Sequence, residues 1–189
     1  MSNAVIASGV VAVAVFGFAP QNRAMLAAGA ERTLRAVLDC LLASLFGWLL
    51  PFGVALGVLL LLPPWAAGAT SILALLFLAL AGLARYVADP DAPAPPRRHS
   101  PPPPFEHLGS PESWAVAMFL AGSALTGSLT LATAFAALTL MAAVGLGMWA
   151  LAGWSGCGHL VSGWHRRHLD WALGMLMFVA ATASLIAEA

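Results

Sequence analysis

Long apolar runs, interrupted by short polar or proline-containing breaks, dominate the chain. A helix needs about 20 mostly apolar residues to cross the hydrocarbon core of a bilayer. Pro63 and Pro64 divide one long run because proline cannot continue a helix, and the small polar residues of 122–128 are typical of a turn. The pattern therefore predicts six transmembrane helices, over residues 4–28, 34–62, 65–87, 111–121, 129–153 and 169–187.

Composition narrows the class of protein to an all-α integral membrane protein. Hydrophobic residues make up 61% of the 189 residues and charged residues only 8%, whereas about 25% of the residues of a soluble domain are charged. The eight basic residues are balanced by eight acidic ones, so no basic excess favours binding to nucleic acid. Membrane lipid is therefore the expected surrounding of the six helices.

The basic residues, all of them arginine, predict the orientation of the chain. Short loops rich in arginine remain on the cytoplasmic side of a membrane. We therefore expect insertion in a bacterial-type inner (plasma) membrane, with both termini on the non-cytoplasmic side. The arginines lie in or beside the first, third and fifth connections between the predicted helices, at positions 23, 32, 35, 85, 97, 98, 166 and 167.

Residues 88–110 separate two groups of three predicted helices. This segment holds most of the prolines of the chain, including Pro101 to Pro104, and proline runs favour extended, non-helical backbone. We expect a cytoplasmic linker between a first repeat at 1–87 and a second repeat at 111–189. Because three is odd, the two repeats begin from opposite sides of the membrane, as inverted repeats do. A docking segment for the aromatic groove of a partner protein is the alternative for the linker.

A polar stretch from Pro20 to Arg23 interrupts the first predicted helix. Residues 4–19 reach only about 24 Å at 1.5 Å per residue, and residues 24–30 are apolar again. A break inside a membrane is tolerated only where the freed backbone is buried in protein or lines a cavity. We therefore predict a helix broken at Pro20 within the membrane, and a first cytoplasmic loop at this point is the alternative.

Arg23 and Asp39 lie eight residues to either side of the expected turn near Glu31. In an antiparallel pair of helices such positions have the same depth, about 12 Å from the turn. A charge inside the hydrocarbon region is costly and needs a partner. The spacing therefore predicts an ion pair between the two side chains. The alternative is that each side chain reaches the aqueous interface separately.

Two short motifs resemble those of the LysE-type amino-acid exporter superfamily. Residues 18–22, with the sequence F-A-P-Q-N, are similar to the P-G-P-x-N break in the first helix of that family. Residues 110–114, with the sequence S-P-E-S-W, are similar to the N-P-K-x-W break in its fourth helix, with Glu112 in place of the lysine. The resemblance implies six helices in two inverted three-helix repeats, with a first helix broken at Pro20 and a second break at Pro111 left open.

The resemblance further implies a secondary transporter that exports an amino acid or a similar small zwitterionic metabolite. Because no histidine lies in a predicted span, Asp39 and Glu112 are the candidate groups that would couple export to proton entry. A non-transporting membrane scaffold or a subunit of a membrane complex is the alternative. The small residues Gly53 and Gly57 favour close helix packing and leave a homodimer open. The expected substrate site consists of Pro20, Gln21, Asn22, Arg23, Asp39, Pro111 and Glu112.

No enzymatic chemistry is expected from the reactive side chains. Cys157 and the scattered histidines near it do not provide the three or four converging ligands that a metal needs. The G-x-S-G string at 153–156 is followed by a last helix without histidine, so Ser155 lacks the base that a nucleophile requires. We therefore expect no catalytic residue, no metal and no cofactor.

The orientation can be tested by thiol labelling of single cysteines in a variant that lacks Cys40 and Cys157. A cysteine at Ser2 or Ala189 should react with a membrane-impermeant reagent added from the non-cytoplasmic side. A cysteine at Ser100 should not, because the surrounding arginines hold this connection on the cytoplasmic side. Labelling at position 100 from outside would overturn the orientation.

Overall fold

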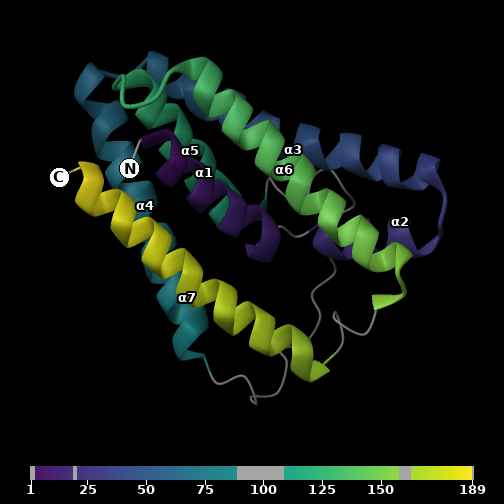
Figure 1. The fold of residues 1–189 in the computed structure, drawn as a ribbon. Helices are drawn as coiled ribbons and strands as arrows, with labels where there is room; N and C mark the ends of the chain where they lie inside the picture. The colour runs from purple at the N-terminus through teal and green to yellow at the C-terminus, as the bar shows by residue number, and fades with distance from the viewer. Residues whose placement is uncertain (1–2, 19–20, 89–108, 158–162, 189) are drawn as a thin grey trace.

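Helices form the architecture throughout the described chain, which contains no strand (Figure 1). The computed structural model describes residues 3–18, 21–88, 109–157 and 163–188. Most of the predicted linker at 88–110 therefore lies outside the described residues, as does Pro20. The elements are α1 (Asn3–Val13), the π-helical turn η1 (Ala14–Phe18), α2 (Asn22–Ala30), α3 (Leu34–Leu60), α4 (Pro64–Val87), α5 (Pro111–Leu125), α6 (Leu131–Trp154) and α7 (Gly163–Glu188).

Four helices are long and apolar enough to cross a membrane, which identifies the chain as an integral membrane protein by the length and composition of its helices. They are α3, α4, α6 and the Arg167–Ile186 part of α7. The pair Ala7–Gly17 and Asn22–Ala30, bent by 62°, makes a fifth span if its two parts are counted together. Helix α5 has 15 residues, about 22 Å at 1.5 Å per residue, which is shorter than the hydrocarbon core of about 30 Å. Six complete spans are therefore not established.

The turn expected at 122–128 begins later than the sequence indicates. Helix α5 continues to Leu125, and the chain turns after it, where Gly127 has a φ of +79°. Gly122 and Ser123 belong to the helix because both face α4. The hydroxyl groups of Ser123 and Ser71 are hydrogen-bonded at 3.1 Å. Small polar residues here bring two helices together instead of starting a turn.

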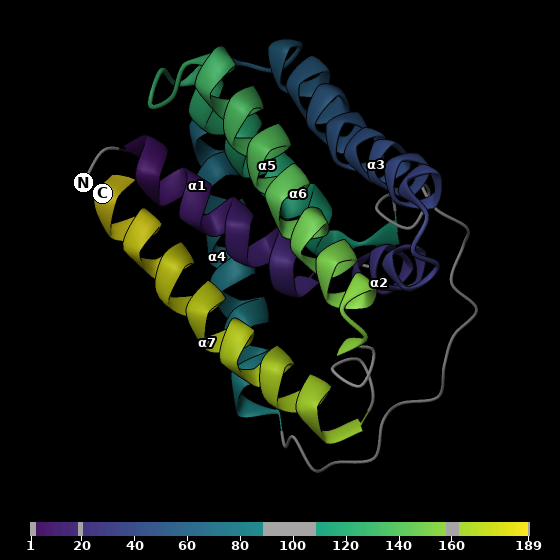
Figure 2. The same cartoon turned by 45° about the vertical axis from the view of Figure 1, so that its right-hand side comes forward.

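The helices pack as a bundle in which α4 contacts α5 and α7, while α6 contacts α1 and α2 (Figure 2). Helix α3 packs on α5 and α6, and α1 lies against both α6 and α7. The beginning of α1 and the end of α7 lie at the same end of the bundle in both views.

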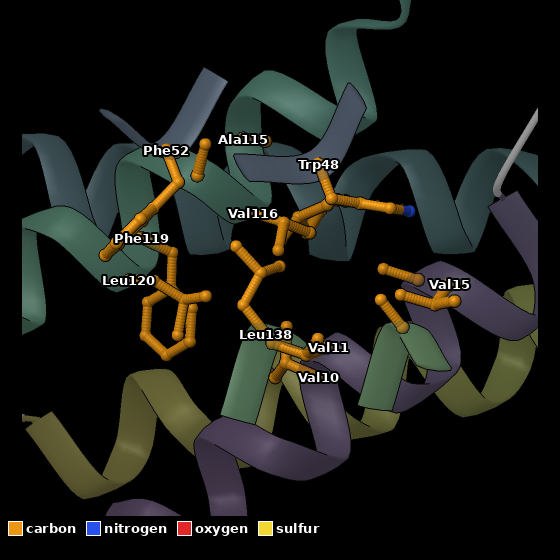
Figure 3. Close-up of a cluster of buried hydrophobic side chains, with 14 of the residues drawn as sticks. Val10, Val11, Val15, Trp48, Phe52, Ala115, Val116, Phe119, Leu120 and Leu138 are labelled. Carbon is orange, nitrogen blue, oxygen red and sulfur yellow. The ribbon is translucent and has the colours of Figure 1, made fainter. Parts of the chain in front are cut away.

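Apolar side chains from five elements meet in the interior of the bundle (Figure 3). Trp48 of α3 lies among Val15 of η1 and Val116 of α5, and Val11 of α1 meets Leu138 of α6. All five side chains are at least 98% buried. Because lipid tails are as apolar as these side chains, close packing and not removal from lipid stabilises the contact.

Glycines allow several helix pairs to approach through their backbones. A Cβ atom added to Gly82 of α4 would lie 2.7 Å from the carbonyl oxygen of Gly174 in α7. A Cβ atom on Gly174 would lie 2.8 Å from the carbonyl oxygen of Gly82. In the same way, Gly29 of α2 faces the backbone of Ala150 in α6. No other residue fits these crossings without a shift of the backbone.

Gly82→Ala should lower the free energy of unfolding by about 1–3 kcal/mol, the usual cost of overpacking a filled interior. The matched control is Gly53→Ala in α3, because a Cβ atom there would have nothing within 4 Å. This control should be neutral or slightly stabilising, since alanine favours a helix more than glycine does. Thermal unfolding in detergent measures both, and equal shifts would contradict the close α4–α7 crossing.

Candidate functional site: the break between η1 and α2

The first helical segment ends at Phe18 and the second begins at Asn22, in a direction that differs by 62°. The predicted interruption of the first helix is therefore present, although Pro20 itself lies outside the described residues. In a regular helix the carbonyl oxygen of Phe16 would accept a hydrogen bond from the residue four positions later. That residue is Pro20, which has no N–H group. The carbonyl of Phe16 therefore needs another donor.

Two side chains supply that donor. The side-chain Nδ2 of Asn22 donates to the carbonyl oxygen of Phe16 at 2.6 Å, and the indole Nε1 of Trp149 donates to the same oxygen at 3.1 Å. The rings of Phe16 and Trp149 also lie close, with centroids 5.5 Å apart. The break is thus fastened to α6, the helix that carries Trp149.

Gln21 is the most unusual residue at the break. Its side chain is fully buried, and neither its Oε1 nor its Nε2 atom has a hydrogen-bond partner among the described residues. The Oδ1 atom of Asn22 is likewise buried without a partner there. Leaving a buried polar group unpaired costs about 1–3 kcal/mol. Two adjacent amides with three such atoms therefore indicate a place for a ligand or for water.

The first turn of α2 adds a positive end to this polar centre. Gln21 occupies the N-cap position, and its side chain makes no capping hydrogen bond. The backbone N–H groups of a first turn have no acceptor within the helix, and they carry about half a positive charge. The carboxyl end of η1 carries the opposite partial charge. Both ends of the broken helix therefore present dipoles of opposite sign at Gln21.

The predicted ion pair between Arg23 and Asp39 is not formed. The carboxylate of Asp39 lies 3.8 Å from the Nε atom of Arg35, one turn earlier on α3, and both side chains are largely exposed. Arg23 is also exposed. Counting residues from the turn gives depth but not rotation about the helix axis, and both residues lie on outward faces. Neither side chain belongs to the polar centre around Gln21.

Pro111 and Glu112 form the beginning of α5. Pro111 is exposed at the first helical position, where its missing N–H group costs nothing. It starts the described helix and does not interrupt it, so a second break at Pro111 is not observed. Glu112 accepts hydrogen bonds at 3.0 Å from both Arg85 and Ser110. This ion pair joins the last turn of α4 to the first turn of α5, where both charges match the helix dipoles.

The six expected site residues that the structure describes are therefore divided among separate places, and Pro20 lies outside the described residues. Gln21 and Asn22 lie together in the interior, whereas Asp39 and Glu112 are each paired with an arginine elsewhere. They cannot line one pocket as expected. A described groove of about 670 Å³ is apolar and lies between α3 and α6, where its lining residues are Leu49, Phe52, Gly53, Leu56, Leu131, Ala132 and Phe135.

Sequence reasoning missed Phe16 and Trp149, which hold the break, and it also missed the buried Ser44. Phe16 could have been identified from the sequence, because it lies four positions before Pro20 and its carbonyl oxygen therefore lacks the usual backbone donor. Trp149 had a weaker signal, since an indole N–H in the middle of an apolar helix needs an acceptor. Ser44 of α3 is fully buried, and its hydroxyl has no partner among the described residues. These residues come from α3, η1 and α6, whose association a single sequence does not reveal.

Neither metal ligands nor relatives identify the site further. The described residues contain no group of three His, Cys, Asp or Glu side chains that would hold a metal ion. Comparison with known protein families, characterised proteins and solved structures finds no match to this chain.

Trp149→Phe should lower the free energy of unfolding by about 1–2 kcal/mol, because it removes one hydrogen bond to the carbonyl oxygen of Phe16 and keeps the ring. Trp154→Phe is the matched control, since Trp154 lies at the end of α6 and is 46% exposed. Thermal unfolding measures the difference. If both substitutions have the same small effect, the bond from Trp149 does not fasten the break.

Proposed function

We propose that the chain is a secondary transporter that exports a small zwitterionic metabolite, such as an amino acid. The observation that carries this proposal is the buried side chain of Gln21 beside a helix break, where neither amide atom has a hydrogen-bond partner among the described residues. A folded scaffold gains nothing from such a group, whereas discontinuous helices hold the substrate in many transporters. The resemblance of residues 18–22 to the LysE-type exporter motif supports the same function.

A zwitterion matches the chemistry of the break. Its carboxylate would accept hydrogen bonds from the N–H groups at the start of α2 and from Nε2 of Gln21. Its ammonium group would donate to Oε1 of Gln21 and Oδ1 of Asn22, near the negative end of η1. Arg23 is exposed and does not provide the countercharge that the sequence indicates, so helix dipoles and neutral amides take that role.

The packing of the helices supports an inverted relation between the two halves. The first half, residues 1–87, contains α1, η1, α2, α3 and α4. The second half, residues 111–189, contains α5, α6 and α7. When the spans of one half are matched in order to those of the other, the contacts correspond. The first span consists of α1, η1 and α2, and its counterpart in the second half is α5. The first span packs on α6 as α5 packs on α3, and it packs on α7 as α5 packs on α4. The pairs α4–α7 and α3–α6 correspond to themselves.

A membrane scaffold or subunit is the second candidate, and two observations favour it. Pro111 begins α5, so the described second half lacks a counterpart to α1. In addition, added Cβ atoms at Gly53 and Gly57 of α3 would meet nothing within 4 Å. These glycines leave a small-residue face free for another helix, including one from a second copy of the chain.

Gln21→Met separates the two functions, because methionine has nearly the shape of glutamine and no amide. As a transporter, the variant should lose export of the solute while its free energy of unfolding rises by about 1–3 kcal/mol, since a buried unpaired polar group is removed. Export is measured by protection of an export-deficient cell against toxic amino acids or peptides, and stability by thermal unfolding.

Ser123→Ala is the control for this test. It removes a buried hydroxyl of α5 that is hydrogen-bonded to Ser71 of α4 and not to Gln21 or Asn22. It should preserve export at a modest cost in stability. A wild-type chain that exports none of the solutes, or a Gln21→Met variant that exports normally, would contradict the transporter and leave the scaffold.

A further inference from the structure

The two carboxylates expected to couple export to proton entry are engaged elsewhere. Asp39 faces Arg35 on the exposed side of α3, and Glu112 is bonded to Arg85 and Ser110 between α4 and α5. Neither of these two carboxylates therefore belongs to the polar centre around Gln21. A proton would find neither of the two expected groups beside the substrate.

The break offers neutral oxygen atoms instead. Oε1 of Gln21 and Oδ1 of Asn22 are buried on adjacent residues, which are 0% and 9% exposed, and neither oxygen has a partner within the described part of the chain. Two independent features point to a cation here: these unpaired oxygens, and the negative carboxyl end of η1 at the same break. Neutral carbonyl oxygens and half-helix carboxyl ends are the groups that hold sodium ions in discontinuous transporter helices.

We propose that the break binds a sodium ion at Oε1 of Gln21 and Oδ1 of Asn22, in competition with the ammonium group of the exported solute. The competition with the solute rests on the proposed transport function, whereas sodium binding itself does not. Both ligands carry one positive charge and use the same two oxygens. Two like charges a few ångströms apart in a low-dielectric interior repel strongly, so the site holds one or the other.

Competition at one site has a direct functional consequence. A site that must release the solute before it takes a sodium ion exchanges the two across the membrane. Inward movement of sodium would then drive outward movement of the solute. Binding and exchange need no titrating residue, which agrees with the positions of Asp39 and Glu112.

Sodium binding is measured on the purified 189-residue chain in nanodiscs, with radioactive ²²Na⁺ and with choline chloride to hold the ionic strength constant. We expect saturable binding that methylammonium chloride displaces competitively, because methylammonium carries the same head group as the solute. Gln21→Met should weaken sodium binding at least tenfold, and Ser123→Ala should leave it unchanged. Gln21→Glu should strengthen binding at least tenfold, because it adds a negative charge at the same position.

The Gln21→Glu variant keeps the test decisive if Gln21→Met does not fold. Absence of saturable sodium binding in the wild type would overturn the proposal. So would binding that neither substitution at Gln21 changes, or binding that methylammonium does not displace.

Transport then separates this inference from the proposed function. Sodium binding in a chain that exports no solute would refute transport and leave the cation site in place. Export that continues when choline replaces sodium on both sides of the membrane would refute sodium exchange and leave transport in place.

Discussion

The carbonyl oxygen of Phe16 cannot be left without a hydrogen-bond donor inside a membrane, where water is absent and each unsatisfied group costs several kcal/mol. Pro20 removes the donor that a regular helix would provide. Asn22 and Trp149 replace it, one from the next helix of the chain and one from α6, 133 residues away in sequence. Because these two side chains replace the missing backbone donor, the first helix can change direction within the bundle. The hydrogen bond from Trp149 also attaches α6 to the break.

The rest of the bundle is organised around that attachment by residues without side chains. Gly29 and Gly153 let α2 approach the backbone of α6, and Gly145 of α6 faces Val15 of η1. Since dispersion contacts weaken quickly with distance, such approaches supply much of the stability that lipid-exposed helices cannot gain from the hydrophobic effect. The interior that results is mostly apolar, so the buried amide of Gln21, which has no partner among the described residues, stands out within it.

Much of the architecture could be predicted from the sequence, because charge-free runs and proline positions act locally. The expected spans at 34–62 and 65–87 differ from α3 and α4 by two residues or fewer at each end. The interruption of the first helix also followed from local composition, since polar residues there separate two apolar segments. Inverted repeats and a six-helix membrane crossing stay predictions.

The errors arose where the outcome depends on rotation or on a distant partner. Asp39 does not pair with Arg23 as predicted, because its exposed carboxylate lies beside Arg35, one turn earlier on α3. Glu112 is held by Arg85, a contact that exists only because α4 and α5 pack side by side. Glycine is typical of turns, yet Gly122 lies within α5, where its small size allows α4 to pack closely. A single sequence contains no record of these tertiary contacts, and Trp149 was missed for the same reason.

Solid-state NMR in lipid bilayers tests the central claim, the double hydrogen bond to the carbonyl oxygen of Phe16. Labelling with carbonyl-¹³C phenylalanine and ¹⁵N glycine selects the three Phe–Gly pairs of the chain, at 16–17, 46–47 and 52–53. Additional ¹⁵Nε1 labelling of tryptophan should reveal a short-range dipolar coupling between one indole nitrogen and the Phe16 carbonyl carbon, and Trp149→Phe should abolish it. Absence of that coupling in the wild type, with the Phe16 carbonyl showing the shift of an ordinary helical residue, would contradict a first helix that is broken and fastened to α6.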